Sequence, residues 1–312
     1  MSFSRFLLQK MMEATAKADM KRLESIDHRS DVHCKAGITY LDDGNPMHTL
    51  NLYYPQNATE KNPTIIDIHG GSWMYGDRDL NRPYCEYLAS QGFHVMGMSY
   101  RLLPDTDLQG MIQDVFCSIH WLEDHAQEYS LDLSQVLLTG DSAGGHLAGL
   151  VICIQNSPRL QRIYNVQPFR FDFSAVAICN GMCEIHDIYP FPAFLRKRID
   201  KEIRRMMLGS RGEHASWRDS MSFSDVANEA EKIALMVIGS ENDPFYNQTE
   251  LLLDTLRANH WLCQELIWKK EKGKHLSHVF QILNPSWEES RITNNKMLEF
   301  FCNAIANRQN IS

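Results

Sequence analysis

Short apolar runs alternate along this chain with longer stretches in which apolar residues recur every three or four positions. The apolar runs occupy residues 37–41, 50–54, 64–69, 94–100, 136–139, 175–179, 234–238 and 265–268. Many are bounded by Gly, Pro, Asn or Asp, which is typical of strands buried on both faces of a sheet. Helical spacing occupies residues 80–90, 108–129, 143–156, 226–233, 247–260 and 287–307. This alternation predicts the α/β class: a mostly parallel eight-stranded sheet, helices on both faces and right-handed connections.

Two segments do not follow this alternation. Residues 3–26 have apolar positions at helical spacing, which predicts either a surface helix packed by one face or part of a cap over an active site. Residues 181–232 contain no strand candidate but include a basic helical stretch at 195–207. A plain loop of that length is unusual, so we interpret the segment as an inserted cap. The sequence therefore predicts one domain with helical cap elements at about 1–30 and 182–225.

Composition excludes several classes of function. The chain of 312 residues has 31 basic and 39 acidic residues, and this net charge of −8 does not support nucleic-acid binding. Its best apolar run, 147–154, is too short for a membrane span, and the run at 6–8 is too short for a signal peptide. Eight scattered cysteines without a CxxC pair indicate a reduced, cytoplasmic protein with no metal and no cofactor. The sequence leaves open whether the protein forms a homo-oligomer.

The strongest chemical signal is the segment Gly-Asp-Ser-Ala-Gly-Gly at 140–145. It follows the apolar run 136–138 and precedes a helical pattern, which is the context that a G-x-S-x-G nucleophile motif requires. A sharp turn there is sterically possible only where close neighbours lack side chains, and Gly140 and Gly144 satisfy that demand. Ser142 is therefore the candidate nucleophile. The alternative is a glycine-rich turn whose serine only caps the helix.

A second signal is the segment His-Gly-Gly-Ser-Trp at 69–73, directly after the apolar run 64–68. Acyl transfer creates a negative oxygen that needs preorganised donors, and backbone with few side chains can approach it closely. We expect the N–H groups of Gly70, Gly71 or Ser72, together with that of Ala143, to form an oxyanion hole. The alternative is a Gly-Gly turn followed by a packing tryptophan.

The segments HGGSW at 69–73, YRLLP at 100–104 and GDSAGG at 140–145 resemble the hormone-sensitive-lipase-like branch of the α/β-hydrolases. The resemblance covers about residues 45–283 and implies the α/β-hydrolase fold and serine esterase activity. The third glycine of the family's HGGG segment is Ser72 here, as in relatives with an HGGxW loop, some of which remove acetyl, feruloyl or formyl groups. A backbone N–H survives that change. The resemblance favours Gly71 and Ser72 over Gly70 as the loop donors.

A serine nucleophile needs a base, and the base needs an acidic partner that fixes its tautomer. In this fold the acid follows a late strand and the histidine follows the last one. The run 234–238 leads to Glu241 and Asp243, and the resemblance favours Asp243 because proline follows it. After 265–268 come His275 and His278. The resemblance favours His278, which has an aromatic residue two positions later.

The sequence thus predicts a serine carboxylic ester hydrolase that acts on short-chain or acetyl esters of small molecules. We expect Trp73 of the glycine-rich loop, with Phe194 and Trp217 of the inserted segment, to contact the substrate. Tyr100, Arg101 and Asp141 are expected to brace the loops, because buried charges and hydroxyls need partners. The alternatives are an amidase or N-formyl hydrolase with the same triad, and a non-catalytic binding protein on a hydrolase scaffold.

Overall fold

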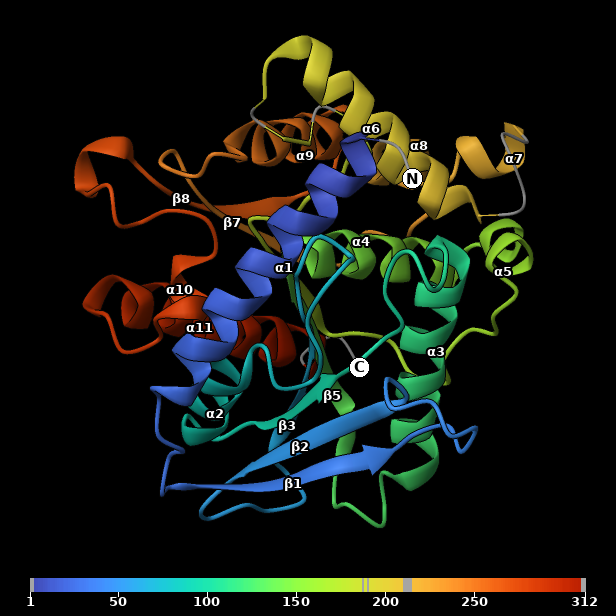
Figure 1. Ribbon diagram of the computed structural model, residues 1–312. Helices are drawn as coiled ribbons and strands as arrows, with labels where there is room; N and C mark the ends of the chain where they lie inside the picture. Colours follow the sequence, from blue (N-terminus) through green and yellow to red (C-terminus); the bar gives the residue numbers. More distant parts are fainter. Residues whose placement is uncertain (1–2, 187, 190, 210–214, 310–312) are drawn as a thin grey trace.

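A single eight-stranded sheet runs through the computed structural model, which describes residues 3–186, 188–189, 191–209 and 215–309 (Figure 1). The strands are β1 (Val32–Thr39), β2 (Thr49–Pro55), β3 (Pro63–Ile68), β4 (His94–Met98), β5 (Asp132–Asp141), β6 (Ala175–Cys179), β7 (Ala234–Ser240) and β8 (Cys263–Trp268). Their order is β1-β2-β4-β3-β5-β6-β7-β8. β2 pairs antiparallel with both β1 and β4, and every pair from β4 to β8 is parallel. The predicted mostly parallel, eight-stranded α/β architecture is confirmed.

The strand patterns follow from burial. β4 and β6 are buried at every position, which explains their continuous apolar runs. β1 differs, because it is an edge strand whose residues are mostly exposed. Its first half is polar, and the sequence pattern therefore placed this strand at 37–41 instead of 32–39.

Helices pack on both faces of the sheet. They are α1 (Phe3–Glu24), α2 (Arg82–Ser90), α3 (Leu108–His125), α4 (Ala143–Asn156), α5 (Pro158–Tyr164), α6 (Ala193–Leu208), α7 (Ala215–Arg218), α8 (Phe223–Val226), α9 (Tyr246–Ala258), the 3-10 turn η2 (Lys270–Lys272), α10 (Phe280–Leu283) and α11 (Glu288–Gln309). α3, α4 and α9 contribute to the core on one face, and α2, α10 and α11 to the core on the other. Adjacent strand residues such as Ile65 and Ile66 point into opposite cores.

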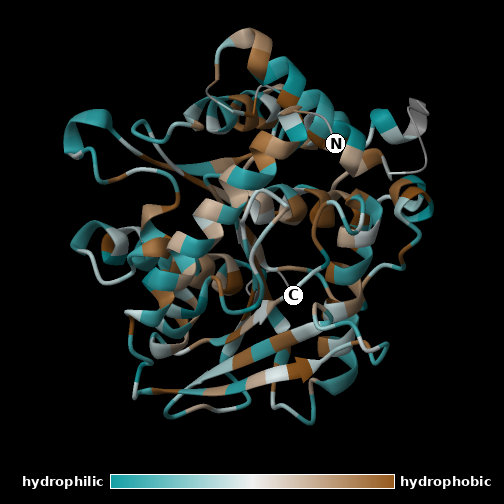
Figure 2. Ribbon diagram, in the orientation of Figure 1, coloured by the Kyte–Doolittle hydropathy of each residue, from teal (hydrophilic) through white to brown (hydrophobic). Residues whose placement is uncertain are grey.

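One helix expected from the sequence lies elsewhere. The spacing predicted a helix at 226–233, but the structure has the short helix α8 at Phe223–Val226. Ser222 and Asp225 form a capping box at its amino end, and this fixes the start of the helix earlier than the apolar spacing indicated. Within the described residues, no helix is both long and apolar enough to cross a membrane; α1 mixes hydrophilic and hydrophobic residues along its length (Figure 2).

α1 runs diagonally across the molecule and packs against α6 (Figure 1). Its carboxyl end is held by two arginines. Arg22 donates from its guanidinium to the carbonyls of Leu80 and Leu283, at 3.4 and 3.1 Å. Arg82 on α2 donates to the carbonyls of Leu23 and Ile26, at 2.9 and 2.7 Å. These bonds fix α1 beside the loops that follow the parallel strands.

Candidate active site

Ser142 lies in a sharp turn between β5 and α4. Its φ of 51° and ψ of −117° are unfavourable for a residue with a side chain. The turn brings backbone so close that a Cβ on Gly144 would lie 1.9 Å from the carbonyl oxygen of Ile68. A Cβ on Gly140 would lie 2.5 Å from the carbonyl oxygen of Gly144. The two glycines therefore permit the turn that presents the serine at the carboxyl edge of the sheet.

The structure brings Ser142, His278 and Asp243 together from the ends of three strands. His278 Nε2 lies 2.9 Å from Ser142 Oγ, and His278 Nδ1 lies 2.8 Å from Asp243 Oδ2. The Phe245 ring packs edge-on against the imidazole, with ring centroids 4.8 Å apart. With the proton on Nδ1 donated to the carboxylate, Nε2 is free to accept the serine proton.

Asn180 is a site residue that sequence reasoning missed. It directly follows β6, and its Nδ2 donates to Asp243 Oδ2 at 2.7 Å. The other carboxylate oxygen, Oδ1, accepts from the backbone N–H of Phe245 at 2.8 Å. Gln281 in turn donates to Asn180 Oδ1 at 3.4 Å. A polar residue at the carboxyl end of a fully buried parallel strand was the available signal.

Both alternative triad residues have partners outside the triad. The Lys269 ammonium lies 2.8 Å from Glu241 Oε1. His275 faces Glu289 at 3.4 Å and packs edge-on against Trp287. Neither Glu241 nor His275 lines the cavity that contains the serine.

The glycine-rich loop after β3 reaches the same place. Gly71, Ser72 and Trp73 all have positive φ, at 99°, 51° and 60°. The N–H of Gly70 donates to Asp141 Oδ1 at 3.0 Å and is therefore already engaged. Gly71 and Ser72 line the cavity beside Ser142. The geometry thus favours these two amides, with that of Ala143, as the donors to an oxyanion.

Tyr100 and Asp141 brace this loop as expected. The Tyr100 hydroxyl donates to the carbonyl of His69 at 2.8 Å, and its ring stacks on the His69 imidazole. Burial lowers the pKa of His69 to about 4, so this imidazole is neutral at pH 7. Arg101 has a different partner: its guanidinium pairs with Asp114 on α3, at 2.6 and 2.8 Å.

The three residues expected to contact the substrate lie elsewhere in the structure. Trp73 is fully buried, and its Nε1–H donates to His146 Nδ1 at 3.2 Å, because the turn that presents Ser72 directs the next side chain into the core. Phe194 is 70% exposed on the outer side of α6. Trp217 packs edge-on against Tyr164. None of the three lines the cavity that contains Ser142.

That cavity has a volume of about 280 Å³, which is near the lower end of the usual range for small-molecule sites. Its walls are mostly apolar. They come from α1, from the loops after β3, β5 and β6, from Phe245 after β7, and from residues 278–283 after β8. The lining residues besides Gly71, Ser72, Ser142 and His278 are Met11, Met12, Thr15, Asp19, Tyr75, Leu80, Asn81, Asp141, Met182, Tyr189, Phe191, Phe245, Val279 and Leu283. The cavity is shaped for a small ligand with an apolar part.

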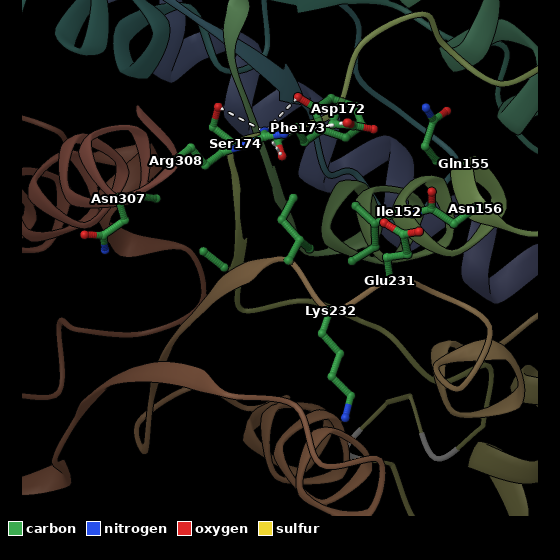
Figure 3. Close-up of a pocket in the computed structure, with 13 residues that line it drawn as sticks. Ile152, Gln155, Asn156, Asp172, Phe173, Ser174, Glu231, Lys232, Asn307 and Arg308 are labelled. Carbon is green, nitrogen blue, oxygen red and sulfur yellow. Dashed lines mark hydrogen bonds and ion pairs between the residues drawn. The ribbon is translucent and has the colours of Figure 1, made fainter. Parts of the chain in front are cut away.

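A second cavity, of about 320 Å³, lies at the amino ends of β6 and β7 (Figure 3). Arg308 of α11 reaches into its wall and donates to the carbonyl of Phe173 and to Ser174 Oγ, at 2.8 and 3.4 Å. Lys232 points away from these residues in Figure 3. None of the predicted catalytic residues lines this cavity. Across the described residues, no three His, Cys, Asp or Glu side chains are grouped as a metal site would require.

Comparison with known proteins gives three kinds of match. A family profile described as BD-FAE matches residues 50–256. Esterase B from Lactobacillus rhamnosis is 41% identical and superposes with a TM-score of 0.92, over 99% of this chain and 98% of that one. Another crystal structure of that esterase, 40% identical with a TM-score of 0.91 over 99% of this chain and 97% of the other, is described as inhibited by a tributyrin phosphonate.

Curated relatives match over shorter segments. The probable carboxylic ester hydrolase LipM of Mycobacterium tuberculosis is 35% identical over 126 residues, which is 40% of this chain and 29% of that protein. Kynurenine formamidase of Drosophila melanogaster is 26% identical over 137 residues, which is 43% of this chain and 45% of that protein. The matched segments therefore span less than half of the length of these relatives.

Proposed function

This chain belongs to the BD-FAE family of the α/β-hydrolases, and from that membership we propose that it is a serine carboxylic ester hydrolase. Its triad is Ser142, His278 and Asp243. The observation that carries this proposal is the unbroken hydrogen-bonded chain from Ser142 Oγ through the imidazole to the Asp243 carboxylate. A serine that only caps a helix does not require a hydrogen bond to a histidine that is itself bonded to a carboxylate.

The reaction proceeds through an acyl-enzyme. Ser142 Oγ forms a bond to the ester carbonyl carbon while its proton passes to His278 Nε2. The carbonyl π electrons move to the oxygen, and this anion is stabilised by the amides of Gly71, Ser72 and Ala143. The intermediate collapses, the ester C–O bond breaks, and the imidazolium gives its proton to the alcohol. Water then attacks the acyl-enzyme by the same route and releases the carboxylic acid.

We propose acetyl and other short-chain esters as the substrates. The small, mostly apolar cavity supports this choice, and so does the tributyrin phosphonate that inhibits esterase B. A panel of p-nitrophenyl acetate, butyrate and octanoate, tributyrin, and matched acetyl- and formyl-anilides tests it. We expect kcat/KM for butyrate or acetate to exceed that for octanoate by about tenfold or more, since pocket fit discriminates by roughly that factor per methylene. It should also exceed that for both anilides, because an amide carbonyl is less reactive and an amine is a poorer leaving group than an alcohol.

An amidase or N-formyl hydrolase is the second candidate, and the matching segment of kynurenine formamidase supports it. Both reactions use the same triad and differ in the leaving group. Faster turnover of the formyl- or acetyl-anilide than of any ester in the panel would favour this candidate and overturn the ester proposal. Failure of Ser142 to react with a fluorophosphonate would contradict both hydrolase candidates and favour a non-catalytic binding protein.

We further propose that α1 and the segment between β6 and β7 form a cap, within about residues 1–30 and 182–225, that limits the acyl chain. Met12 of α1 lines the cavity, so Met12→Ala should enlarge it. We expect the octanoate-to-butyrate ratio of kcat/KM to rise about tenfold, because a few methylenes of added space are worth that much in an apolar pocket. The measurement is the ester panel on purified variants.

Phe194→Ala is the matched control, because that side chain lies on a cap helix but outside the cavity. Its chain-length ratio should equal that of the wild type. An unchanged ratio in Met12→Ala, or an equal rise in Phe194→Ala, would contradict the assignment of α1 as the wall that limits chain length.

A further inference from the structure

Two buried carboxyl groups lie beneath the glycine-rich loop and share one amide. Asp67 on β3 and Asp141 at the end of β5 are 1% and 4% exposed. Asn81 Nδ2 donates to Asp67 Oδ2 at 3.0 Å and to Asp141 Oδ1 at 2.7 Å. The same Asp141 oxygen accepts the N–H of Gly70 at 3.0 Å. A continuous hydrogen-bonded chain therefore runs from Asp67 to the loop that supplies the oxyanion donors.

The surroundings of Asp67 favour its neutral form. Within the described part of the chain, Asp67 Oδ1 has no hydrogen-bond partner, and Oδ2 receives only the Asn81 amide and a thiol 3.6 Å away. The titratable groups that face this carboxyl are acidic ones from four neighbouring elements: Asp141 on β5, Tyr84 and Cys85 on α2, Tyr100 after β4 and Cys179 on β6. No positive charge in this set stabilises an Asp67 carboxylate.

The two carboxyl groups consequently ionise at different pH. Burial and the neighbouring charge of Asp141 raise the pKa of Asp67 to about 8. Burial also raises the pKa of Asp141, to about 6, opposed by the Asn81 amide and the charge of His278. Between these two values Asp141 is charged and Asp67 is neutral. In that state the Asn81 amide donates to one carboxylate and one neutral carboxyl group, rather than to two carboxylates.

We propose that Asp67 and Asn81 are positioning residues for the oxyanion hole, acting on the loop through Asp141. Neutral Asp67 orients the Asn81 amide, the amide orients the Asp141 carboxylate, and the carboxylate holds the Gly70 N–H. The next two amides of the loop are thereby set toward the reacting oxygen. A second negative charge on Asp67 repels Asp141 and competes for the shared amide, so the loop loses its alignment. This inference rests on the proposed hydrolase function.

The test is the pH dependence of kcat for p-nitrophenyl butyrate in the wild type and in Asp67→Asn. The variant retains a carbonyl oxygen for the Asn81 amide but removes the titrating group. We expect the wild-type kcat to fall by about tenfold from pH 7 to pH 9.5, centred near pH 8, with KM changing less than about twofold. Relative to its own value at pH 7, kcat of Asp67→Asn should stay level across this range.

Cys85→Ser is the matched control, because it alters the other donor to Asp67 Oδ2 and leaves the carboxyl in place. Its kcat should still fall between pH 7 and pH 9.5, with a midpoint near pH 8. The inference is overturned if kcat of the wild type does not fall in this pH range, or if kcat of Asp67→Asn falls with the same midpoint. An inactive wild type that does not react with a fluorophosphonate at Ser142 would instead refute the hydrolase function, so the two failures are distinguishable.

A second measurement does not depend on catalysis. The folded protein keeps a proton on Asp67 up to about pH 8, whereas the unfolded chain releases it near pH 4. The stability contributed by this neutral carboxyl is complete below pH 4 and is lost as the pH rises through 8. The free energy of unfolding in urea should therefore fall with pH between 5 and 8 more steeply in the wild type than in Asp67→Asn. Equal slopes would contradict a neutral Asp67.

Discussion

Ser142→Ala should abolish reaction with a fluorophosphonate and lower kcat for p-nitrophenyl butyrate by about 10⁵-fold or more, since loss of a serine nucleophile has an effect of that order. The variant has no oxygen to attack the ester carbon, although the imidazole and the loop amides remain. Alanine retains the backbone of the turn, so the thermal unfolding midpoint should shift little. Stopped assays with excess substrate measure kcat, and mass spectrometry of the treated protein measures labelling.

His275→Ala provides the control for this experiment. It removes the other histidine in the segment after β8, which faces Glu289 rather than the nucleophile. Its kcat should remain within about threefold of the wild type, as is usual for an exposed side chain away from the chemistry. Residual labelling of Ser142→Ala, or a large loss of activity in His275→Ala, would show that the nucleophile or the base is assigned incorrectly.

Asp243→Asn should lower kcat by about 10⁴-fold while leaving substrate binding nearly intact, as expected when a triad histidine is held in the wrong tautomer. The amide can donate to His278 Nδ1, which directs the ring proton to Nε2, the atom that must accept the serine proton. The backbone N–H of Phe245 favours this orientation, because it donates to Asp243 Oδ1 and therefore holds the amide oxygen on that side, and Asn180 Nδ2 then faces the NH2 group and loses its acceptor. Steady-state kinetics at pH 7 measures the change.

Glu241→Gln is the corresponding control. That carboxylate is within two positions of Asp243 in sequence but pairs with Lys269. Its activity should change by less than about threefold, because surface ion pairs contribute little. If Glu241→Gln lost as much activity as Asp243→Asn, the acid of the triad would have to be reassigned.

The sequence was sufficient where one local rule determines the structure. Continuous apolar runs predicted the parallel strands, because strands buried on both faces have no polar side to mark them. The sharp turn at Ser142 was predictable for a steric reason, since neighbouring backbone atoms at Gly140 and Gly144 leave no room for a Cβ. The edge strand β1, with its exposed polar residues, was predicted only in part.

Residues that act through tertiary contacts were not predictable in this way. Asn180 lies about 60 residues from Asp243 in sequence, and only the parallel pairing of β6 with β7 brings the two together. Asn81 meets two carboxyl groups from different strands. The aromatic side chains Trp73, Phe194 and Trp217 were expected at the substrate because they belong to the glycine-rich loop and to the inserted segment. The direction of a side chain depends on the backbone of its turn, which composition does not reveal.

The packing of α1 has a practical consequence for work on this enzyme. Met11, Met12 and Thr15 form part of the wall around Ser142, and Arg22 and Arg82 hold the end of the same helix against the body of the protein. We therefore expect truncations within α1 to change the cavity around Ser142, and amino-terminal fusion tags to be able to disturb it. Kinetic constants measured on tagged and untagged protein should be compared before any substrate preference is assigned, and a carboxyl-terminal tag is the safer choice for purification.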